Sequence, residues 1–161
     1  MERSRTFTWE DPTIGSQQAL KMQGIDYLKS MLEGKLPAPP LVYTLDFKMK
    51  SIEPGKAVFS FIPQEFHYNP IGSVHGGVIS AILDSAMGCT VHSMLPAGKG
   101  YTTLELKANF LRPITKECGE LISEGKIIHM GGKTALVEAQ IIDQAGKVYA
   151  HSVSTCLLFS T

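Results

Sequence analysis

The segment from Gly76 to Leu95 is the strongest constraint on how this chain can fold. It is long, rich in small residues and almost uncharged, and it ends directly before Pro96. A helix that is apolar on nearly all of its faces must be buried on nearly all of them. The sequence therefore predicts a central, buried helix in this segment.

One other segment has a helical period. From Gly15 to Gly34, apolar residues recur at intervals of three and four positions with charged residues between them. This pattern predicts an amphipathic helix over about 16–32, which Gly34 and the prolines of 37–40 bring to an end. Residues 1–14 show no period, and we expect them to form an extended arm.

The remaining segments alternate apolar and polar side chains, which is the period of strands. Turn sequences such as Glu53-Pro54-Gly55 and Gln144-Ala145-Gly146 separate them. Because one amphipathic helix cannot cover a central helix on every side, an antiparallel sheet must curl around it, which gives an α+β fold. Six strands are expected, over residues 41–52, 56–62, 101–111, 120–129, 133–142 and 147–159.

Length and composition indicate an ordinary globular chain. Its 161 residues can bury a core without disulfides or a structural metal. We divide it into an N-terminal arm and helix, 1–40, and a domain of sheet and central helix, 41–161. Lys and Arg together number fifteen, as do Asp and Glu, and this zero net charge argues against nucleic-acid binding.

Location and metal binding are also constrained by the sequence. The uncharged segment is interrupted by Asp84 and His92, which makes it a poor membrane span, and the first residues lack the apolar core of a secretory signal. The three cysteines are widely spaced, as in proteins of a reducing compartment, and the five histidines have no metal-ligand spacing. We expect a cytoplasmic protein without a metal site.

Asp84 is the most unusual residue of the central helix. Burial of a carboxylate costs several kcal/mol unless the group is paired, hydrogen-bonded or open to a cleft. Two interpretations remain open: a surface Asp on a single wet stripe of the helix, or a functional acid.

The start of the same helix is a second candidate. In the sequence His75-Gly76-Gly77, the glycines let another group approach the backbone, and the N–H groups of a first helical turn have no partner within the helix. Such a terminus can stabilise a carbonyl oxygen as negative charge develops on it. The alternative is that the glycines only permit a tight turn from loop to helix.

The spacing of the two candidates has a geometric consequence. Gly76 and Asp84 are separated by about 12 Å of rise along a straight helix, whereas reacting atoms must come within about 3.5 Å. If both serve one reaction, the donor and the acid must come from different subunits whose helices run antiparallel across a two-fold axis. Function would then require a dimer.

Three competing motifs fail. Gly131-Gly132-Lys133-Thr134 resembles the end of a phosphate loop, but the earlier glycine is replaced by Ile127. The stretch 72–76 has valine where a nucleophile elbow needs serine. Cys89 and His92 share a helix face, but nothing in the sequence makes the surroundings of the thiol electropositive.

The segment from Asn69 to Gly77, followed by Asp84, resembles the PaaI-type hotdog-fold acyl-coenzyme A thioesterases. The family has an Asn, a His-Gly-Gly and an Asp at these spacings, and the sequence Phe110-Leu111-Arg112-Pro113 is similar to its strand-ending signature. The resemblance covers about 41–159 and leaves the N-terminal helix outside. It implies the hotdog fold, in which a sheet of about six strands wraps around a long helix.

The resemblance also implies catalytic roles. Asp84 corresponds to the nucleophile or general base, supplied by the subunit opposite the one that supplies Gly76. The Gly76 N–H would polarise the thioester carbonyl, and Asn69 would hold the thioester or the attacking water. A hydroxyl residue at the start of the following strand assists in some members; counting back from Arg112 gives Thr103, with Thr102 as the alternative.

Further residues are candidates for substrate binding. His75 is expected to fix the loop and Gly77 to border the substrate. Arg112, Lys133 and Lys107 are candidates to meet the phosphates of coenzyme A, and Lys133 is preferred. The resemblance implies no cofactor beyond the coenzyme A of the substrate, and it implies a homodimer that pairs into a dimer of dimers.

Alternatives to this function remain. Some hotdog domains bind acyl-CoA as sensors without hydrolysing it, although the presence of both Asn69 and Asp84 favours an enzyme. A hydratase on the same fold would need a paired His and acid that the sequence lacks. The N-terminal helix is a lid, a wall of the acyl pocket, or only a packing element.

Overall fold

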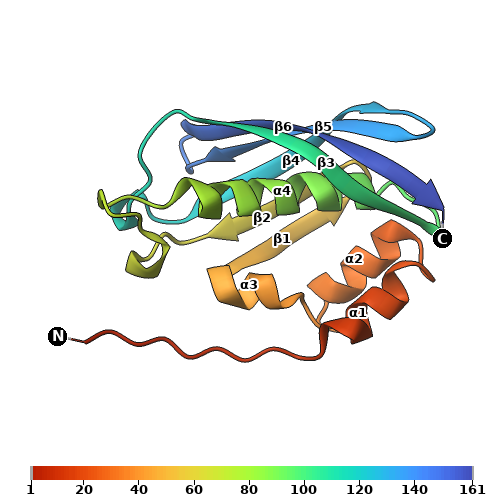
Figure 1. Cartoon of the computed structure of the whole chain (residues 1–161), viewed down its shortest axis with the longest axis horizontal. Coiled ribbons are helices and arrows are strands. Elements are labelled where there is room, and N and C mark those ends of the chain that lie inside the picture. The colour runs from red at the N-terminus through yellow and green to blue at the C-terminus, as the bar shows by residue number, and fades with distance from the viewer. Residues whose placement is uncertain (1, 161) are drawn as a thin grey trace.

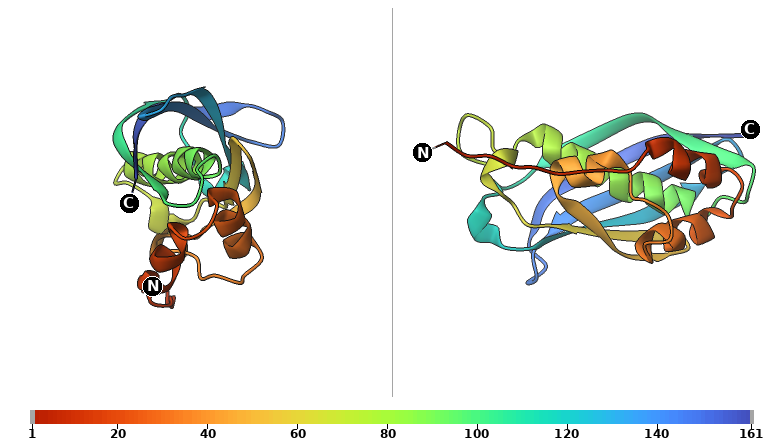
Figure 2. Two further views of the ribbon diagram at one scale, coloured as in Figure 1. Left: turned by 90° about the vertical axis from the view of Figure 1, so that its right-hand side faces the viewer. Right: turned by 90° about the horizontal axis from the view of Figure 1, so that it is seen from below.

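The structure is a computed structural model that describes residues 2–160; residues 1 and 161, which we predicted as ends of the arm and of the sheet domain, lie outside the described part. Six antiparallel strands form one sheet in the order β1-β2-β4-β5-β6-β3. The sheet curls around one long helix, α4 (Gly76–His92), as Figures 1 and 2 show. The predicted hotdog architecture is thus confirmed. The strands span Phe47–Glu53 (β1), Lys56–Phe61 (β2), Lys99–Phe110 (β3), Leu121–Met130 (β4), Thr134–Ile142 (β5) and Val148–Ser160 (β6).

Helix α4 is packed tightly against the sheet. Its side chains without exposed surface include Ile82, Leu83, Ala86, Met87 and Val91. Strand β4 approaches the helix so closely that a Cβ at Gly125 would lie 2.3 Å from the Thr90 Oγ1 and 2.7 Å from the Ala86 carbonyl oxygen. Only glycine permits this approach. The Thr90 hydroxyl in turn accepts a hydrogen bond from the Ala57 N–H of β2 at 3.1 Å, which ties the helix to a second strand.

The predicted helical N-terminal region is confirmed, but the single helix expected over 16–32 is divided into two, α1 (Pro12–Ala19) and α2 (Gly24–Leu32). The break between them is set by a contact with the end of α4. A Cβ at Gly24 would lie 1.7 Å from the carbonyl oxygen of His92, and the Gly24 N–H donates to the carbonyl of Leu95 at 2.9 Å. The predicted arm is also too long, because α1 begins at Pro12.

The first half of the predicted strand over 41–52 is wrong as well. It forms helix α3 (Pro40–Leu45), because a proline in the first turn has the φ that a helix needs and its missing N–H is not required there. The helix ends at Asp46, which has a positive φ of 51°. The carbonyl groups at its C-terminal end accept hydrogen bonds from the Arg5 guanidinium and from the His67 ring.

The three N-terminal helices cover the side of α4 that the curled sheet leaves open (Figure 2). Leu28 of α2 is only 1% exposed and belongs to the same core as α4. The other strands confirm the predicted segments, with ends that differ by one or two residues, and the central helix ends at His92. No helix within residues 2–160 is long and apolar enough to cross a membrane.

Two buried histidines make the stability of the fold depend on pH. His67 accepts from the Gln64 N–H at its Nδ1 and donates from its Nε2 to the Leu45 carbonyl, which requires a neutral ring. Burial lowers the pKa of His67 and of His92, so the unfolded chain binds more protons than the folded chain at mildly acidic pH. The stabilisation is complete above the unfolded pKa of about 6.5 and decreases as the pH falls below it.

We therefore expect a lower urea midpoint at about pH 5.5 than at about pH 7.5. The variant His129→Gln, which alters an exposed imidazole, serves as the control and should show the same pH dependence as the wild type. Equal midpoints at the two pH values would contradict the assigned role of the buried rings.

Candidate active site

Asp84 lies in the middle of α4 and faces β3. Its Oδ1 accepts a hydrogen bond from the Thr103 hydroxyl at 2.9 Å. The Thr102 side chain is exposed, so the structure places Thr103 rather than Thr102 beside the carboxylate. The carboxylate is therefore partly buried and held in one orientation by a neighbouring strand.

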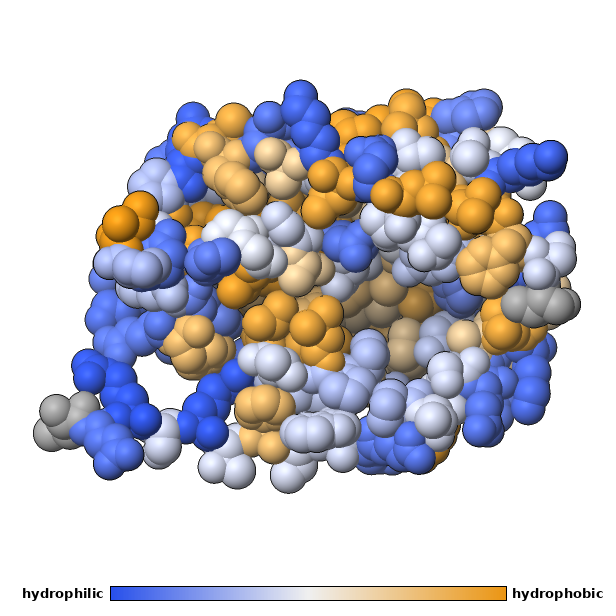
Figure 3. Space-filling model, viewed as in Figure 1, coloured by the Kyte–Doolittle hydropathy of each residue, from blue (hydrophilic) through white to orange (hydrophobic). Residues whose placement is uncertain are grey.

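The Asp84 carboxylate lines a cavity of about 420 Å³ between α4, β1 and the N-terminal helices. Figure 3 shows a hollow in this region with apolar residues around it. Since a cavity of about 150 Å³ already holds benzene, this one has room for a much larger apolar group. Its lining residues are Met31, Leu32, Ala38, Pro39, Leu41, Val42, Phe47, Lys48, Met49, Phe59, Asp84, Ser85, Cys89 and Tyr101.

Two other ionisable side chains of this cavity are neutral at physiological pH. Burial raises the pKa of the Cys89 thiol to about 12, and the Asp84 carboxylate adds to the shift. Burial likewise raises the pKa of Tyr101 well above its ordinary value. A thiol with such a pKa is not a nucleophile, so Cys89 is a packed wall residue. Among residues 2–160, Asp84 is the only carboxylic acid that lines the cavity.

The start of α4 provides one free hydrogen-bond donor. His75 is the N-cap of the helix, and its Nδ1 accepts from the Gly77 N–H at 2.8 Å. The Gly76 N–H has no partner within residues 2–160, and the residue borders a cleft of about 270 Å³. Of the two glycines proposed to meet the substrate, Gly76 has the available donor, because the Gly77 N–H is already paired.

Asn69 holds the loop that leads into α4. Its Oδ1 accepts from the backbone N–H groups of Ile71 and Ser73, at 3.0 and 3.2 Å, and its Nδ2 donates to the Ser73 hydroxyl at 3.1 Å. Asn69 lines the same cleft as Gly76. These contacts show a loop-fixing role, and the second hydrogen of Nδ2 has no partner within the described residues.

The structure does not bring the two halves of the predicted site together within one chain. Gly76 and Asn69 border the cleft at the start of α4, whereas Asp84 borders the larger cavity, and no residue lines both. The helical rise between Gly76 and Asp84 is about 12 Å, as expected for eight residues. The phenyl ring of Phe110, at the end of β3, lies over Gly76, where a Cβ would be 3.1 Å from it.

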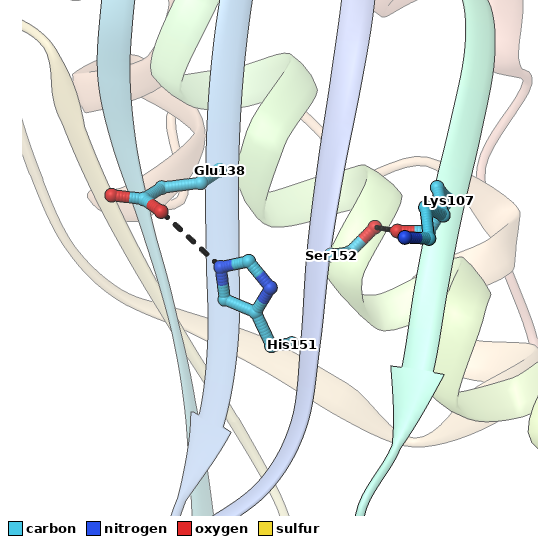
Figure 4. Close-up of polar contacts among 4 residues, drawn as sticks. All are labelled: Lys107, Glu138, His151 and Ser152. Atoms are coloured by element: carbon cyan, nitrogen blue, oxygen red, sulfur yellow. Dashed lines mark hydrogen bonds and ion pairs between the residues drawn. The ribbon is translucent and has the colours of Figure 1, made fainter.

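The three basic candidates lie far apart. Arg112 borders the cleft of Gly76 and donates to the Val148 carbonyl. Lys133 lies in the turn between β4 and β5, near the end of the sheet where β3 begins, since its carbonyl accepts from the Leu158 N–H. Lys107 lies in the middle of β3, and Figure 4 shows its carbonyl group bonded to the Ser152 hydroxyl, away from both cavities.

Of the alternatives left open for the N-terminal helix, the structure favours a wall of the pocket, because Met31 and Leu32 of α2 line the cavity. Sequence reasoning missed the contribution of α3, whose residues Leu41 and Val42 also line it, because this segment was expected to be a strand. In the structure Leu32 and Leu41 are 40% and 45% exposed, so these apolar side chains are not fully used in core packing.

Comparisons with known proteins identify the family of the chain. A family model described as the thioesterase superfamily matches residues 71–150. A protein of Saccharolobus solfataricus named "Putative esterase SSO2140" is 30% identical over 136 residues, which cover 84% of this chain and 95% of the relative. The 1,4-dihydroxy-2-naphthoyl-CoA hydrolase of Listeria monocytogenes is 28% identical over 115 residues, which cover 71% of this chain and 90% of the relative.

Solved structures show the same fold. The phenylacetic acid degradation-related protein of Ralstonia eutropha has a TM-score of 0.72 and 28% identity, over 80% of this chain and 97% of that one. The PaaI protein of Escherichia coli has a TM-score of 0.74 and 21% identity, over 88% of this chain and 96% of that one. The chain belongs to the thioesterase superfamily and is a thioester hydrolase with the hotdog fold.

Proposed function

We propose that the protein hydrolyses an acyl-coenzyme A thioester to the free acid and coenzyme A, at a site shared between two subunits. The observation that carries this proposal is that the two candidate catalytic groups of one chain border two separate cavities. An oriented carboxylate, Asp84, borders an apolar cavity, while a free helix N-terminal donor, Gly76, borders a separate cleft. The similarity to a naphthoyl-CoA hydrolase supports a coenzyme A thioester as the substrate.

The free edge of β3 supports the shared site. This strand lies at the end of the sheet, so its outer edge can pair with the β3 of a second copy. Along β3, Phe110 lies beside Gly76 and Thr103 lies beside Asp84. Antiparallel pairing of Phe110 with the partner subunit's Thr103 puts the two-fold axis midway between these positions, near Leu106 and Lys107. Each Gly76 then faces a carboxylate of the other subunit.

The chemistry follows from these two groups. The Gly76 N–H, at the positive end of the α4 dipole, donates to the thioester oxygen as negative charge develops on it. Asp84 either attacks the carbonyl carbon or removes a proton from the attacking water, and its hydrogen bond with Thr103 keeps it aimed. The carbon–sulfur bond breaks, and the thiolate of coenzyme A leaves with the electron pair. If Asp84 attacks, water then hydrolyses the anhydride formed with Asp84 and restores the carboxylate. If Asp84 takes the proton of water, that proton passes to the leaving thiolate.

Binding of coenzyme A requires no further cofactor in this proposal. Arg112 is placed to meet a phosphate at the Gly76 cleft. The partner's Lys133 lies near the start of the partner's β3. Antiparallel pairing brings that end toward the end of β3 that precedes Arg112. Both residues therefore remain candidates for contacts with the phosphates. We further propose that two such dimers form a tetramer, which light scattering would detect.

The first test is release of free thiol from acetyl-, hexanoyl-, hexadecanoyl- and phenylacetyl-CoA by the purified protein. We expect turnover of at least one of these thioesters, because the site combines an oxyanion donor, a carboxylate and an apolar cavity. Binding of the acyl-CoAs without any thiol release would contradict the proposal and indicate a sensor instead.

A further inference from the structure

A second cavity lies directly behind the cavity at Asp84. Its volume is about 330 Å³, and it lies between α1, α2 and the proline-rich segment 37–39. Ala38 and Pro39 line both cavities. The two spaces are therefore neighbours that share one short stretch of wall. The lining residues of the second cavity are Pro12, Gly15, Ser16, Ala19, Tyr27, Pro37, Ala38 and Pro39.

The chemistry of the second cavity restricts what it can hold. Its lining has no charged residue, and only Ser16 and Tyr27 bring polar side-chain atoms. A charged group placed there would lose its hydration without an opposite charge in return, whereas apolar atoms would leave water at a gain of about 25 cal/mol per Å². The second cavity therefore suits the apolar part of a ligand.

The shared wall is made from residues that leave room. Ala38 has only a methyl side chain, and the prolines beside it have no N–H group that a bound apolar chain would leave unpaired. Nearby, Gly15 is buried, and a Cβ there would lie 3.3 Å from the Tyr27 hydroxyl oxygen. Small residues of α1 and of the segment 37–39 thus keep the second cavity open.

We propose that the two cavities form one extended acyl-binding site, with Ala38 at the passage between them. The first cavity holds the part of the acyl group next to the thioester, and the second holds the far end of a long, uncharged chain. The substrate class is a long-chain acyl-CoA, and Ala38 determines the acceptable length. This inference rests on the proposed thioesterase activity at Asp84.

Two variants test the extended site. Ala19 lines only the second cavity, so the ring of Ala19→Phe fills that cavity alone. Ala38 lines both cavities, so the ring of Ala38→Phe narrows the passage between them, in whichever of the two cavities it lies. For both, we expect kcat/KM for hexadecanoyl-CoA to fall at least about tenfold, the discrimination typical of a hydrophobic pocket, while acetyl-CoA changes by less than about twofold. Ala145→Phe, in the exposed turn between β5 and β6, is the control for an added aromatic ring and should match the wild type.

The outcomes separate this inference from the proposed function. Suppose that the wild type hydrolyses acyl-CoAs but that Ala19→Phe changes kcat/KM equally for all chain lengths, or for none. The proposed extended site is then wrong, whereas the proposed thioesterase activity stands. Preference of the wild type for acetyl-CoA over hexadecanoyl-CoA would overturn the extended site as well. If the wild type hydrolyses no thioester, the proposed function fails and this inference fails with it. Circular dichroism establishes that each variant is folded, and Ala38→Leu replaces Ala38→Phe if the larger residue prevents folding.

Discussion

The variant Asp84→Asn is expected to hydrolyse acyl-CoA at least about a hundredfold more slowly than the wild type, which is the lower bound for removal of a positioned acid–base group. Asparagine keeps the volume of the side chain, and its amide oxygen can still accept from the Thr103 hydroxyl. It has no negative charge with which to attack a carbonyl carbon or to take a proton from water. Thiol release from the best acyl-CoA of the panel measures the effect.

A matched substitution controls for the loss of one carboxylate. Asp26→Asn makes the same chemical change at an exposed position in the first turn of α2 and should retain the wild-type rate. The thermal midpoint and the oligomeric state of Asp84→Asn should equal those of the wild type, because the variant fills the same space. A folded Asp84→Asn protein with near-normal turnover would contradict the proposed role of Asp84 as nucleophile or general base.

The sequence was most informative where local pattern and tertiary environment agree. The uncharged segment after Gly76 predicted the central helix, and alternation predicted five of the six strands closely. In each of these elements the same faces stay buried from end to end, so apolar residues recur in the sequence with a regular period. Thr103 was expected near Asp84 only from the family resemblance, with Thr102 as the alternative, and the structure decides between them because Thr103 donates to Asp84 whereas Thr102 is exposed.

Other features depend on contacts that no local pattern contains. The break before Gly24 exists because that residue meets the backbone of His92, which is distant in sequence. Helix α3 looked like a strand, because Thr44 and Asp46 alternate in the sequence with the apolar side chains of Tyr43 and Leu45.

The candidate site was only partly predictable for the same reason. The sequence His75-Gly76-Gly77 indicates a helix start with free donors, but it does not say that the His75 ring pairs with the Gly77 N–H and leaves Gly76 as the donor. Likewise, Asn69 was expected to hold the thioester or a water molecule, whereas its contacts within the chain fix the loop. Side-chain capping of this kind depends on rotamers that the spacing of residues does not determine.

The shared site leads to the second large effect, which is recovery of activity from two inactive proteins. Gly76→Val places a branched side chain against the Phe110 ring, where even a Cβ would be 3.1 Å from it, and blocks the approach to the Gly76 N–H. Alone, this variant and Asp84→Asn should each be inactive. A heterodimer of the two, isolated with two different affinity tags, contains one composite site with both native groups and one with neither. We expect it to have about half of the activity of the wild-type dimer.

This outcome discriminates between a shared site and one within a single subunit. If each subunit carried its own complete site, every site in the heterodimer would contain one defect, and the mixture would stay as inactive as its parents. A heterodimer of Asp84→Asn with Thr103→Val is the control, because both substitutions affect the same half of the site; each composite site then lacks either the carboxylate or the hydroxyl that orients it. Its activity should not exceed half of that of the Thr103→Val homodimer, because only one of its two sites keeps a carboxylate and that site lacks the Thr103 hydroxyl. Recovery with Gly76→Val therefore requires that the donor of one subunit and the carboxylate of the other act on the same thioester.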